Sequence, residues 1–253
     1  MLKKRIIPVL LLRNGALVKT INFKGYRYIG DPINTVRIFN EMEVDEIILL
    51  DILASKSHAQ PDYQLIEKIS NECFMPLAYG GGISCSEHIK NILSIGIEKI
   101  VLNTSAVNNP DLVEESAKIF GSQCVVGSID YKTNFFNKIP YVYSMCGTQK
   151  TDLNPLEWAT KLEDLGVGEI MITSIDKEGM WAGYDVEVIK NIADQLTIPV
   201  IANGGASSIK DIISVLNNTS CSAAAAGSIF VYQKKDMGVL INFPEKNDLE
   251  QIH

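Results

Sequence analysis

Short apolar runs alternate with longer amphipathic segments along the whole chain. Eight of the runs predict strands, at Ile6–Leu12, Glu46–Leu50, Leu77–Tyr79, Lys99–Leu102, Cys124–Ile129, Glu169–Thr173, Val200–Ala202 and Ala223–Ala226. Several are apolar throughout, which is typical of parallel strands covered on both faces. The segments between them predict helices, at Pro32–Met42, Tyr63–Asn71, Glu87–Ser94, Pro110–Phe120, Pro155–Leu165, Val186–Gln195 and Ile209–Leu216. This alternation favours an α/β fold of the (β/α)8 TIM-barrel type over an open doubly wound sheet.

The second half of the chain repeats the first at an offset of 123 residues. Pro32 corresponds to Pro155, Pro76 to Pro199, and the glycine pair at 81–82 to the pair at 204–205. The repeat divides the eight strands into two sets of four. We therefore expect two half barrels, at about 1–122 and 123–240, that close into one domain covering 1–253, with a polar C-terminal tail at 241–253.

Composition and charge narrow the classes of function. The chain has 253 residues and a formal net charge of −7, and an acidic balance disfavours a nucleic-acid or anionic-membrane surface. Its five cysteines are scattered and its three histidines are dispersed, so neither a disulfide framework nor a metal site is expected. The sequence has no apolar stretch of membrane-spanning length. We expect a cytoplasmic protein without a cofactor.

Glycines and small polar residues follow equivalent strands in the two halves. They are Gly81 and Gly82 with Asn103 and Thr104 in the first half, and Gly204 and Gly205 with Gly227 and Ser228 in the second. Glycine lets backbone N–H groups approach an anion, and a following helix N-terminus favours negative charge. The duplication predicts two phosphate pockets on opposite sides of the barrel mouth. The alternative is that these glycines only form tight turns.

Three aspartates lie at or just beyond strand C-terminal ends, where barrel enzymes carry their active sites. Asp51 ends the second predicted strand, Asp130 the fifth, and Asp176 follows the sixth. Asp130 lies at the centre of the mouth, where desolvation can tune a carboxylate for acid–base chemistry. For Asp51 and Asp176, capping of a helix or loop is an equally good interpretation.

Four charged residues begin strands at the opposite end of the barrel: Arg5, Glu46, Lys99 and Glu169. If their side chains point inward, they form a ring of alternating charge across the barrel floor. The alternative is a set of solvated caps, and surface ion pairs contribute little to stability.

From end to end through about residue 235, the sequence resembles the cyclase subunit of imidazole glycerol phosphate synthase (HisF). The segments that carry the resemblance are Gly15–Asp31, Leu50–Ile52, Gly80–Ile83, Asn103–Val107, Gly121–Val126, Glu169–Ser174, Ala182–Asp185 and Ala202–Ala206. The resemblance implies a half-barrel repeat, two phosphate sites with Lys19 on the first mouth loop, and a HisH-like glutaminase docked on the floor. It also implies that the four floor charges gate the passage of ammonia into the barrel.

The sequence departs from that family at its chemistry. The family carries two catalytic aspartates, of which Asp130 matches the second while Leu11 stands in place of the first. Leucine cannot transfer a proton, so the acid–base pair is broken. The family's DRDGT motif becomes the segment from Asp176 to Met180, which loses a hydroxyl near the second phosphate site.

An intact ammonia passage with a damaged cyclase centre is similar to the HisF-related proteins that form acetamidino sugars in surface-polysaccharide gene clusters. The segments at 8–12, 28–32 and 73–77 resemble that branch. The resemblance implies that the chain receives ammonia for amidination of an N-acetyl sugar, together with an ATP-dependent amidotransferase and a phosphate-bearing small molecule. Two alternatives stay open: ordinary cyclase activity in histidine biosynthesis, and a non-catalytic ammonia conduit or scaffold.

Overall fold

Parallel strands form a closed ring at the centre of the molecule. The structure is a computed structural model, which describes residues 3–134, 138–245, 249 and 251–252. Within these residues the ring has eight strands, in the order β1 (Arg5–Arg13), β4 (Ile47–Asp51), β5 (Leu77–Gly80), β6 (Lys99–Leu102), β7 (Val125–Thr133), β10 (Glu169–Ser174), β11 (Val200–Asn203) and β12 (Ala223–Ala226). Pairing of β12 with β1 closes the ring. The predicted (β/α)8 barrel is confirmed.

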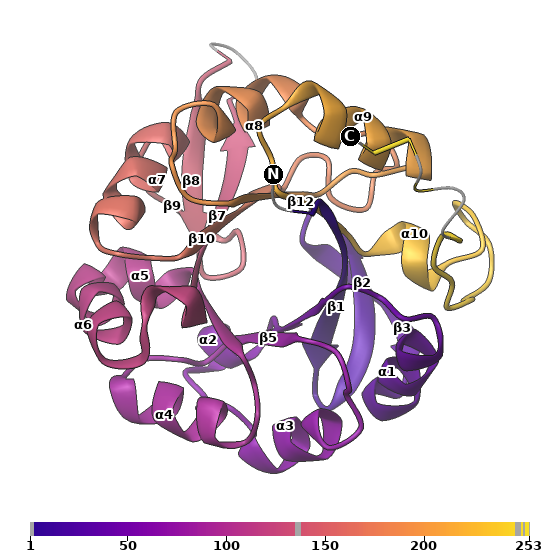
Figure 1. The fold of residues 1–253 in the computed structure, drawn as a ribbon, viewed down its shortest axis with the longest axis horizontal. Helices are drawn as coiled ribbons and strands as arrows, with labels where there is room; N and C mark the ends of the chain where they lie inside the picture. The colour runs from indigo at the N-terminus through magenta and orange to yellow at the C-terminus, as the bar shows by residue number, and fades with distance from the viewer. Residues whose placement is uncertain (1–2, 135–137, 246–248, 250, 253) are drawn as a thin grey trace.

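Helices surround the strands on the outside (Figure 1). They are α1 (Pro32–Glu41), α3 (Tyr63–Ser70), α4 (Ser86–Ser94), α6 (Pro110–Phe120), α7 (Pro155–Asp164), α8 (Val186–Ala193) and α9 (Ile209–Asn218). Local sequence sets where several begin. The side chains of Asp31 and Asn154 accept hydrogen bonds from first-turn N–H groups of α1 and α7, and a proline follows each cap.

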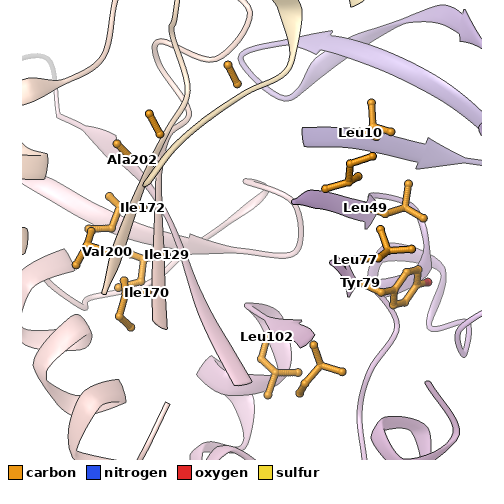
Figure 2. Packing of buried hydrophobic residues seen from close by; sticks show 14 of the residues in the cluster. Leu10, Leu49, Leu77, Tyr79, Leu102, Ile129, Ile170, Ile172, Val200 and Ala202 are labelled. Atoms are coloured by element: carbon orange, nitrogen blue, oxygen red, sulfur yellow. The ribbon is translucent and has the colours of Figure 1, made fainter. Parts of the chain in front are cut away.

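The strands separate two apolar layers. Residues on the outer faces of the strands pack under the helices, and Figure 2 shows part of this layer, including Leu49, Tyr79 and Ile172. A smaller cluster fills the barrel itself. In β1, Ile7 and Leu11 belong to this inner cluster, whereas Ile6, Leu10 and Leu12 belong to the outer layer. The two-residue period of a strand therefore decides which side chains face the barrel axis.

Two hairpins at the barrel mouth were not predicted as strands. The first consists of β2 (Ala16–Ile21) and β3 (Lys24–Gly30), and the second of β8 (Pro140–Ser144) and β9 (Gln149–Lys150). Each pairs antiparallel with the extended end of a barrel strand, β2 with β1 and β8 with β7. Within the expected first mouth loop, Lys19 therefore lies on β2, a strand that pairs with β1 on one side and β3 on the other.

Short helices also follow three of the barrel strands at the mouth. They are α2 (Ala54–Ser57), α5 (Thr104–Asn108) and α10 (Ser228–Val231). A 3-10 turn, η1 (Ser122–Cys124), lies instead before the start of β7. Helices α5 and α10 follow β6 and β12, the fourth strands of the two expected half barrels. The same order of elements thus recurs in both parts of the chain. The half-barrel boundaries and the single-domain assignment of 1–253 stay predictions.

Two details differ from expectation. Glu46 precedes β4 by one residue instead of beginning it, yet its side chain is buried. The C-terminal segment is less polar in its contacts than its sequence indicated, because Ile241, Phe243 and Leu249 pack against the core. The centroid of the Phe243 ring lies 5.3 Å from the centroid of the Phe230 ring on α10. In the part of the chain that the structure describes, no helix has the length and apolarity needed to cross a membrane.

The packing of α1 gives a direct test of the fold. Phe39 on α1 is fully buried, whereas Phe74 is 85% exposed. We expect Phe39→Ala to lower the free energy of unfolding by about 3–5 kcal/mol, because it removes a ring from the helix–strand layer and leaves a cavity. Phe74→Ala is the matched control and is expected to change it by less than ~0.5 kcal/mol. Urea unfolding of both variants measures the difference, and equal losses would contradict the placement of α1.

Candidate functional site

The four predicted charges meet at the floor of the barrel. Arg5 donates to Glu46 at 2.5 Å and also to Glu169, while Lys99 donates to Glu46 at 2.8 Å and to Glu169 at 3.1 Å. Each cation thus contacts both carboxylates and each carboxylate contacts both cations. The residues form a closed ring of alternating charge, which we call the floor ring.

The floor ring lies mostly out of solvent. The side chains of Glu46 and Glu169 are 3% and 7% exposed, and those of Arg5 and Lys99 are 23% and 19% exposed. Burial acts to lower the pKa of Arg5, but the contacts with Glu169 and Glu46 outweigh it, and the pKa is raised. The ring is therefore a buried, mutually neutralised network and not a set of solvated caps. Removing one member leaves an uncompensated buried charge.

A pocket opens at the other end, on the side formed by the first half of the chain. Its walls include Leu11, Leu50 and Val101 from the strands and Phe23 and Tyr26 from the first hairpin. Asp130 and Asn103 add polar groups beside this apolar wall. The predicted residues Asp51, Gly81, Gly82 and Thr104 also line the pocket. The fold thus brings the predicted first phosphate set and the predicted catalytic residue into one cavity.

Asp130 lies inside the mouth on β7. Asn103 Nδ2 lies 3.3 Å from its Oδ2 and also donates to Ser128 O at 3.1 Å. Burial raises the pKa of Asp130 to about 7, a hydrogen bond from Thr173 opposes the rise, and the negative charge of Glu178 adds to it. A carboxyl group that titrates near neutral pH can both accept and donate a proton.

Leu11 on β1 lines the same pocket as Asp130 and is 8% exposed. It pairs in register with Leu50 of β4 and with Val18 of the first hairpin. Its side chain belongs to the apolar cluster that fills the barrel. Strand β1 contains no Asp or Glu, whereas β7 carries Asp130.

Close packing alone requires glycine at both glycine pairs. Gly81 has φ +119°, and a Cβ there would lie 2.4 Å from Asp51 O; at Gly204, with φ +89°, it would lie 2.9 Å from Ser174 O. Gly82 and Gly205 are similarly crowded, by the carbonyl oxygens of Ala59 and Gly183 in the preceding loops. The tight-turn interpretation is therefore sufficient for the residue type. Phosphate binding at these positions stays a prediction.

The short helices α5 and α10 begin at the remaining residues of the two predicted phosphate sets. Their N-caps, Asn103 and Gly227, make no side-chain capping bond. Thr104 Oγ1 accepts a hydrogen bond from Met145 N at 3.0 Å, so the second hairpin rests on the first phosphate set. Ser228 lines a second pocket, on the other side of the mouth, together with Lys19.

Lys19 lies beside this second set in a buried ion pair. The side chain is 4% exposed, and its Nζ contacts Glu178, whose side chain is 9% exposed. A Cβ added at Gly227 would lie 2.5 Å from Lys19 Nζ, so the ammonium group directly borders the start of α10. The Lys19–Glu178 ion pair also ties the first hairpin to the loop after β10. Because the partners are 159 positions apart, the sequence pattern gave no sign of the pair.

The other two aspartates support local structure. Asp51 Oδ1 accepts hydrogen bonds from Leu53 N and Ala54 N, at 2.9 and 3.0 Å, and so caps the start of α2. Asp176 is exposed and accepts from Thr133 N at 2.9 Å. Asp51 still borders the first pocket. The described lining of the two mouth pockets does not include Asp176.

Sequence reasoning missed several polar side chains at the mouth. Asn203 on β11 is buried and donates to Thr173 Oγ1 at 3.1 Å. Among the described residues, Asn203 Oδ1 and the hydroxyl of Thr20 are buried without a hydrogen-bond partner. Thr20 lines both mouth pockets. The signal that could have found Asn203 is its place at the end of β11, directly before the glycine pair. Within the described ranges, no three His, Cys, Asp or Glu side chains gather as a metal site.

These features define the class of the protein: a (β/α)8 barrel with paired small-residue sets at the mouth and a floor closed by a ring of charge. A family model described as "Histidine biosynthesis protein" matches residues 5–236, and the chain belongs to this family. It is 50% identical over 250 residues to the "Putative imidazole glycerol phosphate synthase subunit hisF2" of Pseudomonas aeruginosa, covering 99% of each chain.

Two further relatives agree. The chain is 45% identical over 252 residues to the "Putative imidazole glycerol phosphate synthase subunit HisF" of Leptospira interrogans, covering 100% of this chain and 99% of the relative. It is 41% identical over 242 residues to the "Imidazole glycerol phosphate synthase subunit HisF" of Petrotoga mobilis, covering 94% and 96%. The chain is thus HisF-like over its whole length.

The pKa of Asp130 predicts a pH-dependent stability. Because the folded-state pKa, about 7, exceeds the value of ~3.9 for an unfolded chain, the folded state binds the extra proton between these pH values. Stability from this group is present below pH ~4 and is lost as the pH rises through 7. We expect Asp130→Asn to remove this part of the decline in unfolding free energy. Urea unfolding between pH 4 and 8 measures it, and parallel curves for the two proteins would contradict the burial of Asp130.

Proposed function

We propose that this chain is a synthase subunit that receives ammonia from a HisH-like glutaminase and passes it through the barrel for amidination of an N-acetyl sugar. The product would carry an acetamidino group in surface-polysaccharide biosynthesis. The observation that carries the proposal is a closed floor ring in the same barrel as a mouth pocket that is lined by both Leu11 and Asp130.

The floor ring supports the ammonia part of the proposal. Its four side chains close the floor end of the barrel by ion pairing, not by bulky apolar groups. Ammonia is small and polar, so a displacement of one ion pair gives it a hydrogen-bonding path. The interior beyond the ring is lined by apolar residues such as Ile48 and Val126, which hold no proton donors for ammonia. Uncharged ammonia can cross this lining without being trapped as ammonium.

The mouth supports a reaction other than cyclisation. With Leu11 in place, Asp130 has no carboxylate across from it on β1, and an acid–base pair needs two titrating groups. A single carboxyl group with a pKa of about 7 suits one proton transfer, such as removing a proton from ammonia as it bonds to carbon. The apolar wall of Leu11, Leu50 and Val101 suits the methyl of an acetamido group.

The proposal requires two partners. A HisH-like glutaminase docked on the floor supplies ammonia, and an ATP-dependent amidotransferase activates the amide oxygen of the sugar so that ammonia can replace it. The substrate is a phosphate-bearing small molecule held by the sets around Gly82, Thr104, Gly205 and Ser228. The name HisF, carried by the relatives, supports the pairing with a glutaminase.

Neutralising one floor carboxylate tests the ammonia route. We expect Glu46→Gln to reduce glutamine-dependent amidination by about tenfold or more while ammonium-chloride-dependent amidination changes little, because Arg5 and Lys99 lose a shared anion and the floor no longer closes and opens normally. The assay combines the chain with its glutaminase and amidotransferase.

The control for this variant is Glu67→Gln on the exposed surface of α3. It removes the same charge away from the barrel axis and is expected to leave both activities unchanged. An equal loss with glutamine and with ammonium chloride in Glu46→Gln would contradict the ammonia route.

Cyclase activity in histidine biosynthesis is the second candidate, favoured by the near-neutral pKa of Asp130. We expect the unaltered chain, mixed with a HisH-like glutaminase and the cyclase substrate, to form no substantial imidazole glycerol phosphate. Leu11→Asp restores the missing carboxylate and is expected to raise the rate by at least about 10²-fold, the usual contribution of general acid–base catalysis. Substantial product from the unaltered chain, measured by liquid chromatography, would favour the cyclase over the amidination proposal.

A further inference from the structure

The outer rim of the second phosphate set carries two adjoining cavities. The first, of about 260 Å³, lies between the β2–β3 hairpin and the segment after α10, and Ser228 is among its lining residues. The second, of about 620 Å³, lies between that segment and the start of α9. Trp181 and Lys235 line both, so they stand at the boundary between the two. Together the cavities reach the size of ordinary small-molecule sites.

Cations concentrate in the first cavity. Lys24, Arg27 and Lys235 line it, in addition to the ion-paired Lys19, and Asp236 is the acidic residue in the lining. The second cavity adds Lys234. Since the chain has a net charge of −7, this local positive field runs against its average.

The cavity is built by specific contacts. The Arg27 guanidinium lies 4.9 Å from the centroid of the Tyr232 ring, and Arg27 Nη2 donates to Met237 O at 3.0 Å. These contacts hold the C-terminal segment against the hairpin, and Figure 1 shows the yellow segment beside β3 and α10. Trp181 has φ +58°, an unusual conformation for a bulky residue. That backbone places a large half-buried ring at the boundary of the two cavities.

We propose that these two cavities bind a nucleoside diphosphate group. The diphosphate would lie in the first cavity, with one phosphate at Ser228 and the other among Lys24, Arg27 and Lys235. The base would stack on Trp181 and extend into the second cavity, because aromatic side chains bind nucleobases through their π-faces. The inference deepens the proposed function by naming the sugar substrate as nucleotide-activated, and it rests on that function for the identity of the sugar.

Fluorescence titration tests the site without any partner protein. The chain has two tryptophans, and Trp158 lies on the buried face of α7, so Trp181 is expected to report on the cavity. We expect UDP or ADP to quench this signal with a Kd about tenfold or more below that of inorganic phosphate, because two phosphates and a base add contacts. Trp181→Phe is expected to abolish the quenching and to weaken binding measured by calorimetry.

Charge reversal at exposed positions provides the matched comparison. Lys24→Glu and Lys235→Glu are expected to weaken UDP and ADP binding by about tenfold or more, since charge-assisted contacts are replaced by repulsion. Lys90→Glu, on the exposed face of α4, makes the same change elsewhere and is expected to have no effect. Unfolding curves confirm that all three variants fold.

Three results would overturn the inference: no binding of UDP or ADP, binding no tighter than that of inorganic phosphate, or binding unaffected by Lys235→Glu. The proposed function fails by a different result. If nucleotide binds as expected but the complete three-protein system forms no acetamidino product from any nucleotide-linked N-acetyl sugar, the site is real and amidination is wrong. Amidination of a sugar that carries no nucleotide, with an unchanged rate in Lys235→Glu, would contradict only the nucleotide site.

Discussion

Closure of a ring of parallel strands is the constraint on which the rest of this molecule depends. Every pair of neighbouring strands in the ring is parallel, and pairing of β12 with β1 closes the strands around one axis. All strand beginnings then meet at the floor and all strand ends meet at the mouth. Residues as distant in sequence as Arg5 and Glu169 become neighbours, as do Asn103 and Asp130. The two-residue period of each strand decides which of them face the axis.

This constraint explains how much the sequence could predict. The eight apolar runs and the helix caps at Asp31 and Asn154 are local signals, and the ring follows from their order. Three members of the floor ring are first residues of strands: Arg5, Lys99 and Glu169. Because the strands are parallel, their common direction is enough to predict that these residues lie at the same end of the barrel. The hairpin at 16–30 was harder to predict, because its strands contain polar residues such as Lys19 and Thr20 that are buried only by tertiary contacts.

Side chains beyond the strand ends were the least predictable. Asp51 ends β4 and Asp176 follows β10, yet Asp51 turns back to cap α2 and Asp176 supports the end of β7. No periodic pattern extends into such loops, so the direction of these side chains is set by the nearest backbone N–H groups. The Lys19–Glu178 pair depends on contact between a hairpin and a distant loop. The two sides of the mouth consequently differ more than the 123-residue repeat indicated, with an apolar pocket on one side and a basic one on the other.

The central claim is that ammonia crosses the barrel from the floor ring to the mouth beside Asp130. The most direct measurement supplies the reconstituted system with glutamine labelled with ¹⁵N at the amide, in the presence of excess unlabelled ammonium, and follows the label in the acetamidino product by mass spectrometry. The account predicts that the product keeps nearly all of the label, because ammonia does not mix with the solvent on its way. A label diluted to the isotope ratio of the bulk solution would contradict it.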